Sequence, residues 1–378
     1  MNILVAIDSF KGSMTSEVAN QHVQDAFCDH NVITFPIADG GEGTVLAFTQ
    51  LLTGELITET ITGPTGELID ASYGWVEKDK LAIIEVAEGA GITKVDPSLL
   101  DPRHHTSYGV GEQIIAALNK GAQEIIIGLG GSATVDGGMG LLQALGVKFF
   151  DQQGMEMTML PVRLADIGRI DQVNIDPRVN SVKLTIASDV SNPLLGSNGA
   201  CYVFGPQKGL AIEQLNSYEA GMRHFAQLVN TVTGIAMQNE PGAGAAGGIG
   251  FALYAFLNTS FQSGFSLLAD KGELASLIKQ VDLVITGEGK FDQQSLSGKV
   301  PIGISRLAKA YDKPTIVFTG KADNGLTALP EENILAVIPI VDEAIPLTEA
   351  IKNGPQLLKR AADRTLRLIM CGISLNKY

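Results

Sequence analysis

NILVAIDSFKGSMTS, residues 2–16, begins with a mostly apolar run and ends in a lysine, a glycine and hydroxyl side chains. The apolar run predicts a buried strand over 2–7, and TSEVANQHVQDAF (15–27) has the period of a helix. The segments NVITFPIA (31–38) and GTVLAFTQLL (43–52) repeat this order of strand and helix. The alternation predicts an α/β fold with a parallel sheet and crossover helices.

The character of the sequence changes near residue 53. Residues 53–89 are rich in Thr and Ile with Gly and Pro turns, which predicts antiparallel strands. Strand–helix alternation returns at 282 and ends in one long helix expected from about 346 to 369. At a length of 378 residues we expect two domains, an α/β domain of residues 1–53 plus 282–378 and an inserted mixed α/β domain of residues 54–281.

The composition restricts the classes of partner. The formal net charge of −14 opposes binding to nucleic acid or to a membrane, so an anionic substrate needs a local basic pocket. No apolar run reaches about 18 residues, and the amino terminus has no signal-peptide pattern. The three cysteines form no CxxC pair, which indicates a reducing compartment. We therefore expect a cytoplasmic protein, and its assembly into a homo-oligomer stays open.

The first candidate site residues follow the first two predicted strands. Asp8 lies at the carboxyl end of its strand, where α/β sheets bind ligands, and Asp39 occupies the same place in PIADGGEGT (36–44). Two such carboxylates could orient a hydroxyl or hold Mg²⁺, although an Asp-Gly turn is the alternative for Asp39. Lys11 adds nothing to a helix amino terminus, so an anionic ligand explains it better. The hydroxyls of residues 13–16 are interpreted as helix caps.

A glycine-rich segment, GLGGSATVDGGMG (128–140), follows the apolar strand EIIIGL (124–129). Glycines let backbone N–H groups approach an anion, and hydroxyls add donors. We interpret the segment as a phosphate or nucleotide loop rather than a structural turn, with candidate residues Gly130, Gly131, Ser132, Thr134 and Asp136. A second glycine run, PGAGAAGGIG (241–250), lacks a preceding strand and suits an anion site or close helix packing equally. No Walker GxxxxGK[ST] motif is present.

Two further clusters place polar groups after predicted strands. LTIASDVSNPLLGSNGA (184–200) contains Asp189 and Asn192, and FGPQKG (204–209) contains Lys208. Acids, amides and lysines on glycine turns suit a phosphate, its metal and a hydroxylated or carboxylate substrate. Exposed ion-pair loops are the alternative interpretation. DLVITGEGKFDQQSLSGK (282–299) adds a longer set of candidates after another strand: Glu288, Lys290, Asp292, Ser295 and Lys299.

Seven motifs in this order, DSFKGSMTS, PIADGGEGT, GLGGSATVDGGMG, ASDVSNPLLG, GPQKG, PGAGAAGGIG and TGEGKFDQQSLSGK, closely resemble the bacterial glycerate kinases that phosphorylate D-glycerate at the 2-hydroxyl. The resemblance covers nearly the whole chain. It implies ATP and Mg²⁺, a flavodoxin-like domain from both chain ends, an inserted mixed α/β domain and a site between them. It also implies phosphoglycerate as product, with 2-phosphoglycerate favoured, in the breakdown of glyoxylate-derived or sugar-acid carbon.

Phosphoryl transfer needs positioning and charge neutralisation more than covalent chemistry. On the loop interpretation, Asp8 or Asp189 accepts the proton of the substrate hydroxyl. Asp39 or Asp292 helps to hold Mg²⁺. The choice between Asp8 and Asp189 as the base, and between Asp39 and Asp292 as the metal ligand, is left open.

The lysines are the expected anion ligands. Lys11, Lys290 or Lys299 meets phosphate oxygens or the glycerate carboxylate, and residues 128–140 give backbone donors to ATP. Three alternative functions stay open: a kinase of another small hydroxy acid, a nicotinamide-dependent oxidoreductase using the glycine runs, and a nucleotide-binding regulator without turnover. The oxidoreductase is disfavoured because the strand expected before residue 241 is weak.

Overall fold

The computed structural model describes residues 1–292, 295, 300–323 and 329–375. The chain separates into two compact units, one of Met1–Ala38 with Phe265–Tyr378 and one of Asp39–Gly264. The changes of unit lie about fifteen residues before the predicted domain boundaries at 53/54 and 281/282. The difference at the first boundary arises because helix α2 (Thr44–Leu51) packs on strands β4 (Leu68–Val76) and β5 (Leu81–Glu85) of the second unit.

The first unit contains a five-stranded parallel sheet of order β13-β12-β11-β1-β2. Its strands are β1 (Asn2–Ile7), β2 (Asn31–Thr34), β11 (Leu283–Phe291), β12 (Thr315–Ala322) and β13 (Ile334–Pro339). Its helices are α1 (Ser16–Ala26), α9 (Leu274–Lys279), α10 (Val300–Lys309), α11 (Leu347–Lys352) and α12 (Gly354–Leu375), and α8 (Gly264–Lys271) begins at its boundary. The expected parallel sheet is confirmed.

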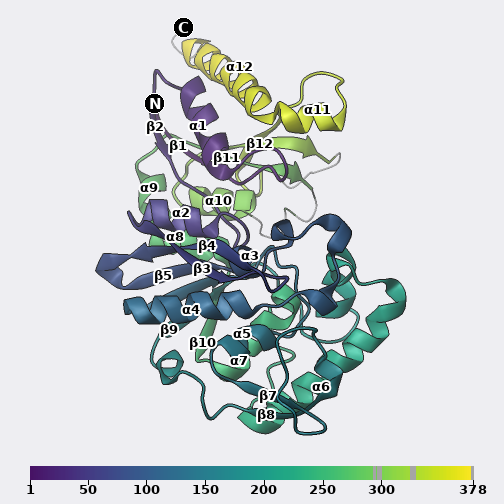
Figure 1. Cartoon of the computed structure of the whole chain (residues 1–378). Helices are drawn as coiled ribbons and strands as arrows, with labels where there is room; N and C mark the ends of the chain where they lie inside the picture. Colours follow the sequence, from purple (N-terminus) through teal and green to yellow (C-terminus); the bar gives the residue numbers. More distant parts are fainter. Residues whose placement is uncertain (293–294, 296–299, 324–328, 376–378) are drawn as a thin grey trace. The chain divides into compact units, whose positions relative to one another are not determined.

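Both faces of this sheet are covered by helices. Figure 1 shows α1 and α12 on one face and α10 on the other. Phe318 of β12 packs in the cluster that contains residues of α1 and α12, whereas Val317 packs with Ile302 of α10. This alternation is what a strand between two helical layers requires, because successive side chains point to opposite faces.

Two sequence expectations for this unit are corrected. The terminal helix is not continuous, because α11 ends at Lys352 and α12 begins at Gly354, and α12 runs to Leu375 rather than to about 369. Pro355 in the first turn of α12 fits a helix start, since it has no N–H to contribute. The strand β11 also extends to Phe291, because Lys290 and Phe291 pair with Lys321 and Ala322 of β12. Glu288 and Lys290 are therefore strand residues.

The second unit contains a six-stranded mixed sheet of order β10-β9-β6-β5-β4-β3 and a two-stranded sheet of β7 and β8. The large sheet consists of β3 (Glu55–Thr62), β4 (Leu68–Val76), β5 (Leu81–Glu85), β6 (Glu124–Gly128), β9 (Lys183–Ala187) and β10 (Thr259–Gln262). Strands β3, β4 and β5 are antiparallel, as expected, and β5, β6, β9 and β10 are parallel. The small sheet consists of β7 (Lys148–Asp151) and β8 (Ile167–Asp171).

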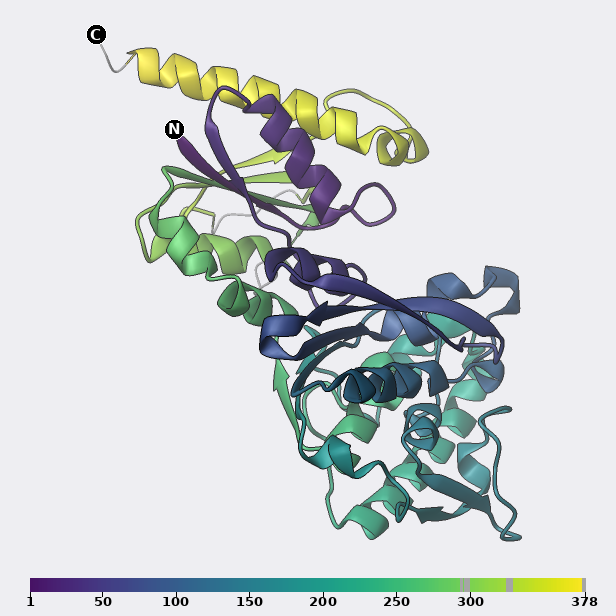
Figure 2. The ribbon, with the colours of Figure 1, turned by 60° about the vertical axis from the view of Figure 1, so that its left-hand side comes forward.

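Helices cover this second sheet as well. They are α2, α3 (Val86–Ala90), α4 (Tyr108–Lys120), α5 (Met139–Ala144), α6 (Leu215–Thr233) and α7 (Ile249–Phe256). Figure 2 shows the sheet beside α4, with α2 on its other side. One large apolar core includes Trp75, Phe149, Phe225 and Phe251, all of them fully buried. Among the described residues, no helix has both the length and the apolar character needed to cross a bilayer.

Candidate active site

Three parallel strands of the second unit end side by side. Glu85 of β5 pairs with Gly128 of β6, which pairs with Ala187 of β9, and each is the last residue of its strand. The segments that follow β6 and β9 therefore start from one edge of the sheet. This is the edge where α/β proteins bind ligands.

The predicted motifs at 36–44 and 128–140 are in direct contact at this edge. The amide of Gly130 donates to the carbonyl of Gly40 at 3.0 Å. A Cβ atom at position 130 would lie 2.3 Å from the Cα of Gly41, so only glycine permits this approach. Packing between the two loops therefore explains Gly130, and a contact of Gly130 with a nucleotide stays a prediction.

The next two residues have free backbone donors. Within the described part of the chain, no acceptor takes the amide N–H of Gly131 or of Ser132. Gly131 has a φ of +74°, a left-handed conformation that turns the backbone sharply. Adjacent amides in such a turn form an anion-binding concavity. These two positions are the part of the loop that suits a phosphate oxygen.

Lys208 lies beneath this loop, not on the surface as its position in a glycine turn suggests. Its side chain is 2% exposed. The ammonium donates to Ser132 Oγ at 2.7 Å and to the carbonyl oxygen of Thr134 at 2.9 Å. Burial lowers the pKa of Lys208 to about 7, and the nearby Asp136 and Cys201 act against that change. Lys208 thus joins the 204–209 turn to the 128–140 loop.

Asp136 holds the end of the same loop. Its carboxylate accepts hydrogen bonds from the backbone and hydroxyl of Ser107, at 2.9 and 2.6 Å, and from the amides of Gly138 and Gly140, at 3.0 and 3.2 Å. The residue is 1% exposed. These bonds give Asp136 a part in shaping the loop, and direct contact with a ligand stays a prediction.

The second glycine run packs against the first. A Cβ atom at Gly247 would lie 1.9 Å from the carbonyl oxygen of Thr134, and one at Gly248 would lie 2.8 Å from the Cα of Gly137. Close packing therefore accounts for this run, as one of the two interpretations expected.

Asp39 and Asp189 are two acidic residues at this edge that interact with each other. Asp189 Oδ1 accepts a hydrogen bond from the amide of Gly264 at 3.1 Å, and Ser263 also bonds its carboxylate. Desolvation raises the pKa of Asp189 and the charge of Asp39 raises it further, whereas the hydrogen bonds from Ser263 and Gly264 act against the rise. Asp39 Oδ1 accepts the amide of Gly41 at 3.0 Å. The direction of this pKa shift is the one that a general base requires.

Mg²⁺ binding by Asp39 or Asp292 stays a prediction. No group of three or more His, Cys, Asp or Glu side chains among the described residues could enclose a metal ion. Mg²⁺ is commonly held by only one or two carboxylates together with substrate phosphates, so a smaller set of protein ligands is compatible with it. Asp292, the other expected ligand, is engaged by Lys290 at 2.7 Å and by the amide of Ser295 at 3.2 Å.

Asn192 and the surrounding loop are held by backbone contacts. Asn192 Nδ2 donates to the carbonyl of Asn198 at 2.8 Å, and the backbone carbonyl of Asn192 accepts the amide of Gly244 at 2.9 Å. A contact between Asn192 and a substrate stays a prediction.

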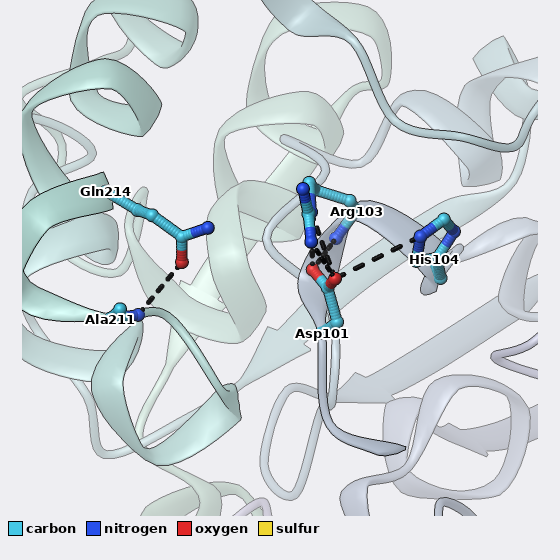
Figure 3. Close-up of polar contacts among 5 residues, drawn as sticks. All are labelled: Asp101, Arg103, His104, Ala211 and Gln214. Atoms are coloured by element: carbon cyan, nitrogen blue, oxygen red, sulfur yellow. Dashed lines mark hydrogen bonds and ion pairs between the residues drawn. The ribbon is translucent and has the colours of Figure 1, made fainter.

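Figure 3 shows two polar contacts of the second unit. Arg103 forms an ion pair with Asp101. The side-chain oxygen of Gln214 accepts a hydrogen bond from the amide of Ala211.

The first unit groups its own candidates at the carboxyl edge of β1, β11 and β12. Asp8 Oδ1 accepts the amide of Ser9 at 2.7 Å, and the amide of Asp8 donates to the carbonyl of Gly287. Glu288 is buried on β11, and Lys11 is exposed. A Cβ at Gly289 would lie 3.6 Å from the amide of Lys11, so the 8–11 turn lies against β11.

The hydroxyls of residues 13–16 were expected to be helix caps, but only that of Thr15 is one. Thr15 Oγ1 accepts the amide of Val18 at 3.3 Å and caps α1. Ser16 Oγ donates to the carbonyl of Ile7, and Ser13 Oγ donates to the carbonyl of Ile351. Ser295, another candidate, is buried and accepts the amide of Asp292 at 3.1 Å. Lys299 lies outside the described residues.

Three residues at these edges were missed by the sequence reasoning. Lys321 pairs in register with Lys290, and both belong to a Lys-x-Asp triplet, at 290–292 and 321–323, which is the signal that could have found it. Glu85 is buried at the amino end of α2, where burial raises its carboxyl pKa to about 7. Gly264, which contacts Asp189, carries no sequence signal of its own.

Residues 3–370 match the glycerate kinase family. The chain belongs to the glycerate kinase family. It is 38% identical to the glycerate 2-kinase of Escherichia coli strain K12, over 99% of each chain, and 38% identical to the glycerate kinase of Bacillus subtilis strain 168, over 100% of this chain and 99% of that protein. A crystal structure entitled putative glycerate kinase 2, from Salmonella typhimurium LT2, superposes with a TM-score of 0.84 at 36% identity, covering 99% of both chains.

Membership in this family makes the protein a kinase, and ATP is the phosphate donor that the family implies. The match extends through both units, so each cluster of candidate residues lies inside the family region. A kinase transfers a phosphoryl group and has no use for a nicotinamide ring. The oxidoreductase alternative is thereby set aside.

Proposed function

We propose that this protein transfers the γ-phosphoryl group of ATP to the 2-hydroxyl of D-glycerate, giving 2-phosphoglycerate and ADP. The observation that carries the proposal is the full-length match to the glycerate kinase family. The name of the Escherichia coli relative, glycerate 2-kinase, supports the 2-hydroxyl as acceptor. Dependence on ATP, together with cysteines that form no disulfide, supports a cytoplasmic location.

We assign the proton-accepting role to Asp189. As the bond from the glycerate oxygen to phosphorus forms and the bond to the ADP oxygen breaks, the hydroxyl proton passes to the Asp189 carboxylate. Its raised pKa supports this role. Asp8 is the alternative base. Asp39 is the proposed Mg²⁺ ligand, and the ion would neutralise charge on the ATP phosphates.

Anionic groups would be bound by two kinds of donor. The amides of Gly131 and Ser132 suit phosphate oxygens, as described above. Lys11 and Lys290, at the carboxyl edge of the parallel sheet, suit a phosphate or the glycerate carboxylate. We extend this second role to Lys321, which lies opposite Lys290.

The topology of the first unit supports a flavodoxin-like assignment. Numbered within this unit, its strands have the order 2-1-3-4-5, with the reversal between β1 and β11. We propose that the two compact units are the two domains of the family fold, a discontinuous flavodoxin-like domain and an inserted mixed α/β domain.

A coupled assay of ADP release tests the function. D-glycerate, L-glycerate and glycolate are compared with and without Mg²⁺, and phosphorus NMR of the product distinguishes 2- from 3-phosphoglycerate. We expect Mg²⁺-dependent turnover with D-glycerate and a product phosphorylated at position 2. Faster turnover with glycolate would favour a kinase of another small hydroxy acid, and ATP binding without turnover would favour a regulator.

A further inference from the structure

Lys208 has an unusual place for a candidate phosphate ligand. The side chain is almost fully buried, and two of its three donors are engaged, by Ser132 Oγ at 2.7 Å and by the Thr134 carbonyl at 2.9 Å. These acceptors lie on either side of Ala133, so the ammonium fixes both ends of a three-residue arc. A lysine that binds a phosphate of a passing nucleotide is normally accessible to it, whereas this one is covered by the loop.

The direction of the Lys208–Ser132 bond determines what Ser132 can do. In its charged form Lys208 can only donate, so Ser132 Oγ is then the acceptor. The single proton of the hydroxyl is then left to point elsewhere, and within the described part of the chain no acceptor takes it. Ser132 is 6% exposed, so its hydroxyl retains a small opening to solvent.

Two backbone donors adjoin this hydroxyl. The amides of Gly131 and Ser132 are without an acceptor among the described residues, as described above. Together with the Ser132 hydroxyl they form three donors within two consecutive residues. Such a set matches the oxygens of a phosphate group, which accept several short hydrogen bonds.

We propose that Lys208 is a positioning residue, which turns the Ser132 hydroxyl into a dedicated donor to a phosphate oxygen of the nucleotide without touching that phosphate itself. The proposal deepens the proposed kinase function and rests on it for the identity of the ligand. The Thr134 carbonyl is held by the Lys208 ammonium and is also closely packed against Gly247, which fixes this part of the loop.

Calorimetric titration of the full chain with ADP and Mg²⁺ tests this without requiring glycerate turnover. Ser132→Ala, Lys208→Met and the double variant are compared with the wild type. A hydrogen bond to a charged group contributes about 1.5–3 kcal/mol, so each single change should weaken ADP binding roughly 10- to 100-fold. Because Lys208 acts through the Ser132 hydroxyl, its loss should have little further effect once that hydroxyl is gone, so the double variant should bind no more than about threefold more weakly than Ser132→Ala.

Lys183→Met is the matched control, since Lys183 lies on β9 with 67% of its side chain exposed and pairs with Glu124. It should bind ADP like the wild type. Kinetics add a second readout: the KM for ATP should rise in Ser132→Ala while the KM for glycerate stays within about twofold.

Several results would overturn the proposal. If Lys208 contacted the phosphate directly, Ser132→Ala would release the ammonium, and ADP affinity would stay the same or increase. The proposal would also be contradicted if the loss of ADP affinity in the double variant equalled the product of the losses in the two single variants. Ser132→Ala keeps the test decisive if Lys208→Met does not fold. Normal ADP affinity without glycerate phosphorylation would refute the kinase function alone, whereas absence of ADP binding in the wild type would refute this proposal.

Discussion

Lys290 and Lys321 lie directly opposite each other on the neighbouring parallel strands β11 and β12. Like charges in such a position repel each other, and pairs of this kind change stability by roughly 0.2–1 kcal/mol. The Asp292 carboxylate, 2.7 Å from Lys290, compensates one lysine and raises its pKa. The charge of Asp323 raises the pKa of Lys290 as well. The proposal that Lys290 and Lys321 bind an anionic group predicts that the ligand adds to this compensation.

Replacing Lys321 tests this proposal. We expect Lys321→Met to leave the stability of the ligand-free protein unchanged or slightly higher, since repulsion is relieved. The KM for ATP or for glycerate should rise about tenfold, the effect of about 1.4 kcal/mol of lost interaction. Thermal unfolding and steady-state kinetics give the two quantities. Lys309→Met, on α10, is the control of equal charge, and equal kinetics in both variants would exclude Lys321 from the site.

A comparison of turnover decides whether Asp189 or Asp8 is the general base. Loss of a general base costs about 10²- to 10⁴-fold in rate, so Asp189→Asn should reduce kcat by that amount, with ADP affinity little changed. Asp8→Asn should have the smaller effect on kcat. A larger loss in Asp8→Asn, with both variants folded by circular dichroism, would transfer the role of base to Asp8.

Gly264 is expected to be intolerant of a side chain. A Cβ atom there would lie 2.4 Å from the carbonyl carbon of Asp39 and from the amide nitrogen of Gly40, both of them backbone atoms. Gly264→Ala should therefore destabilise the protein by about 1–3 kcal/mol and lower kcat, since both Asp39 and Asp189 adjoin this contact. Chemical denaturation measures the first effect. At Gly372, where a Cβ meets nothing within 4 Å, the same change should be neutral or stabilising.

Glu85 predicts a pH dependence of stability. Burial raises its carboxyl pKa to about 7 in the folded protein, from 4.5. Between these values the folded state holds a proton that the unfolded chain has lost, so the free energy of unfolding falls as pH rises from about 4.5 to 7. The fall due to Glu85 is on the order of 3 kcal/mol, at 1.36 kcal/mol per pKa unit.

Glu85→Gln removes this titration and keeps an oxygen that can accept from the amide of Val45. Urea denaturation across pH 5–8 should show a smaller decline for the variant than for the wild type. An identical decline in the two proteins would mean that the Glu85 carboxyl is ionised throughout this range.

The sequence allowed much of the local structure to be predicted, because it depends on neighbouring residues. The strand of residues 2–7, the cap at Thr15 and the antiparallel character of 55–85 follow from apolar periods and turn residues. The placement of candidate residues after strands followed from the same patterns. The break after Lys352 was missed because a helical pattern continues through Asn353.

Contacts between distant segments could not be predicted in this way. A lysine in the turn GPQKG suggests an exposed cation, and only the fold shows that Lys208 is buried under residues 132–134. The register that sets Lys290 against Lys321 is likewise a property of paired strands. Gly130 was interpreted as a ligand contact, whereas its contact with Gly41 depends on two loops that are ninety residues apart.

The contact of Gly264 with Asp39 and Gly40 brings the two ends of the second unit together. Asp39 is the first residue of the second unit and Gly264 is its last, so this unit begins and ends at a single point. A segment whose ends meet can be accommodated in a surface loop of a host domain without stretching that loop. Because their ends are adjacent, residues 39–264 could be expressed alone, circularly permuted by joining those ends, or inserted into a loop of another protein.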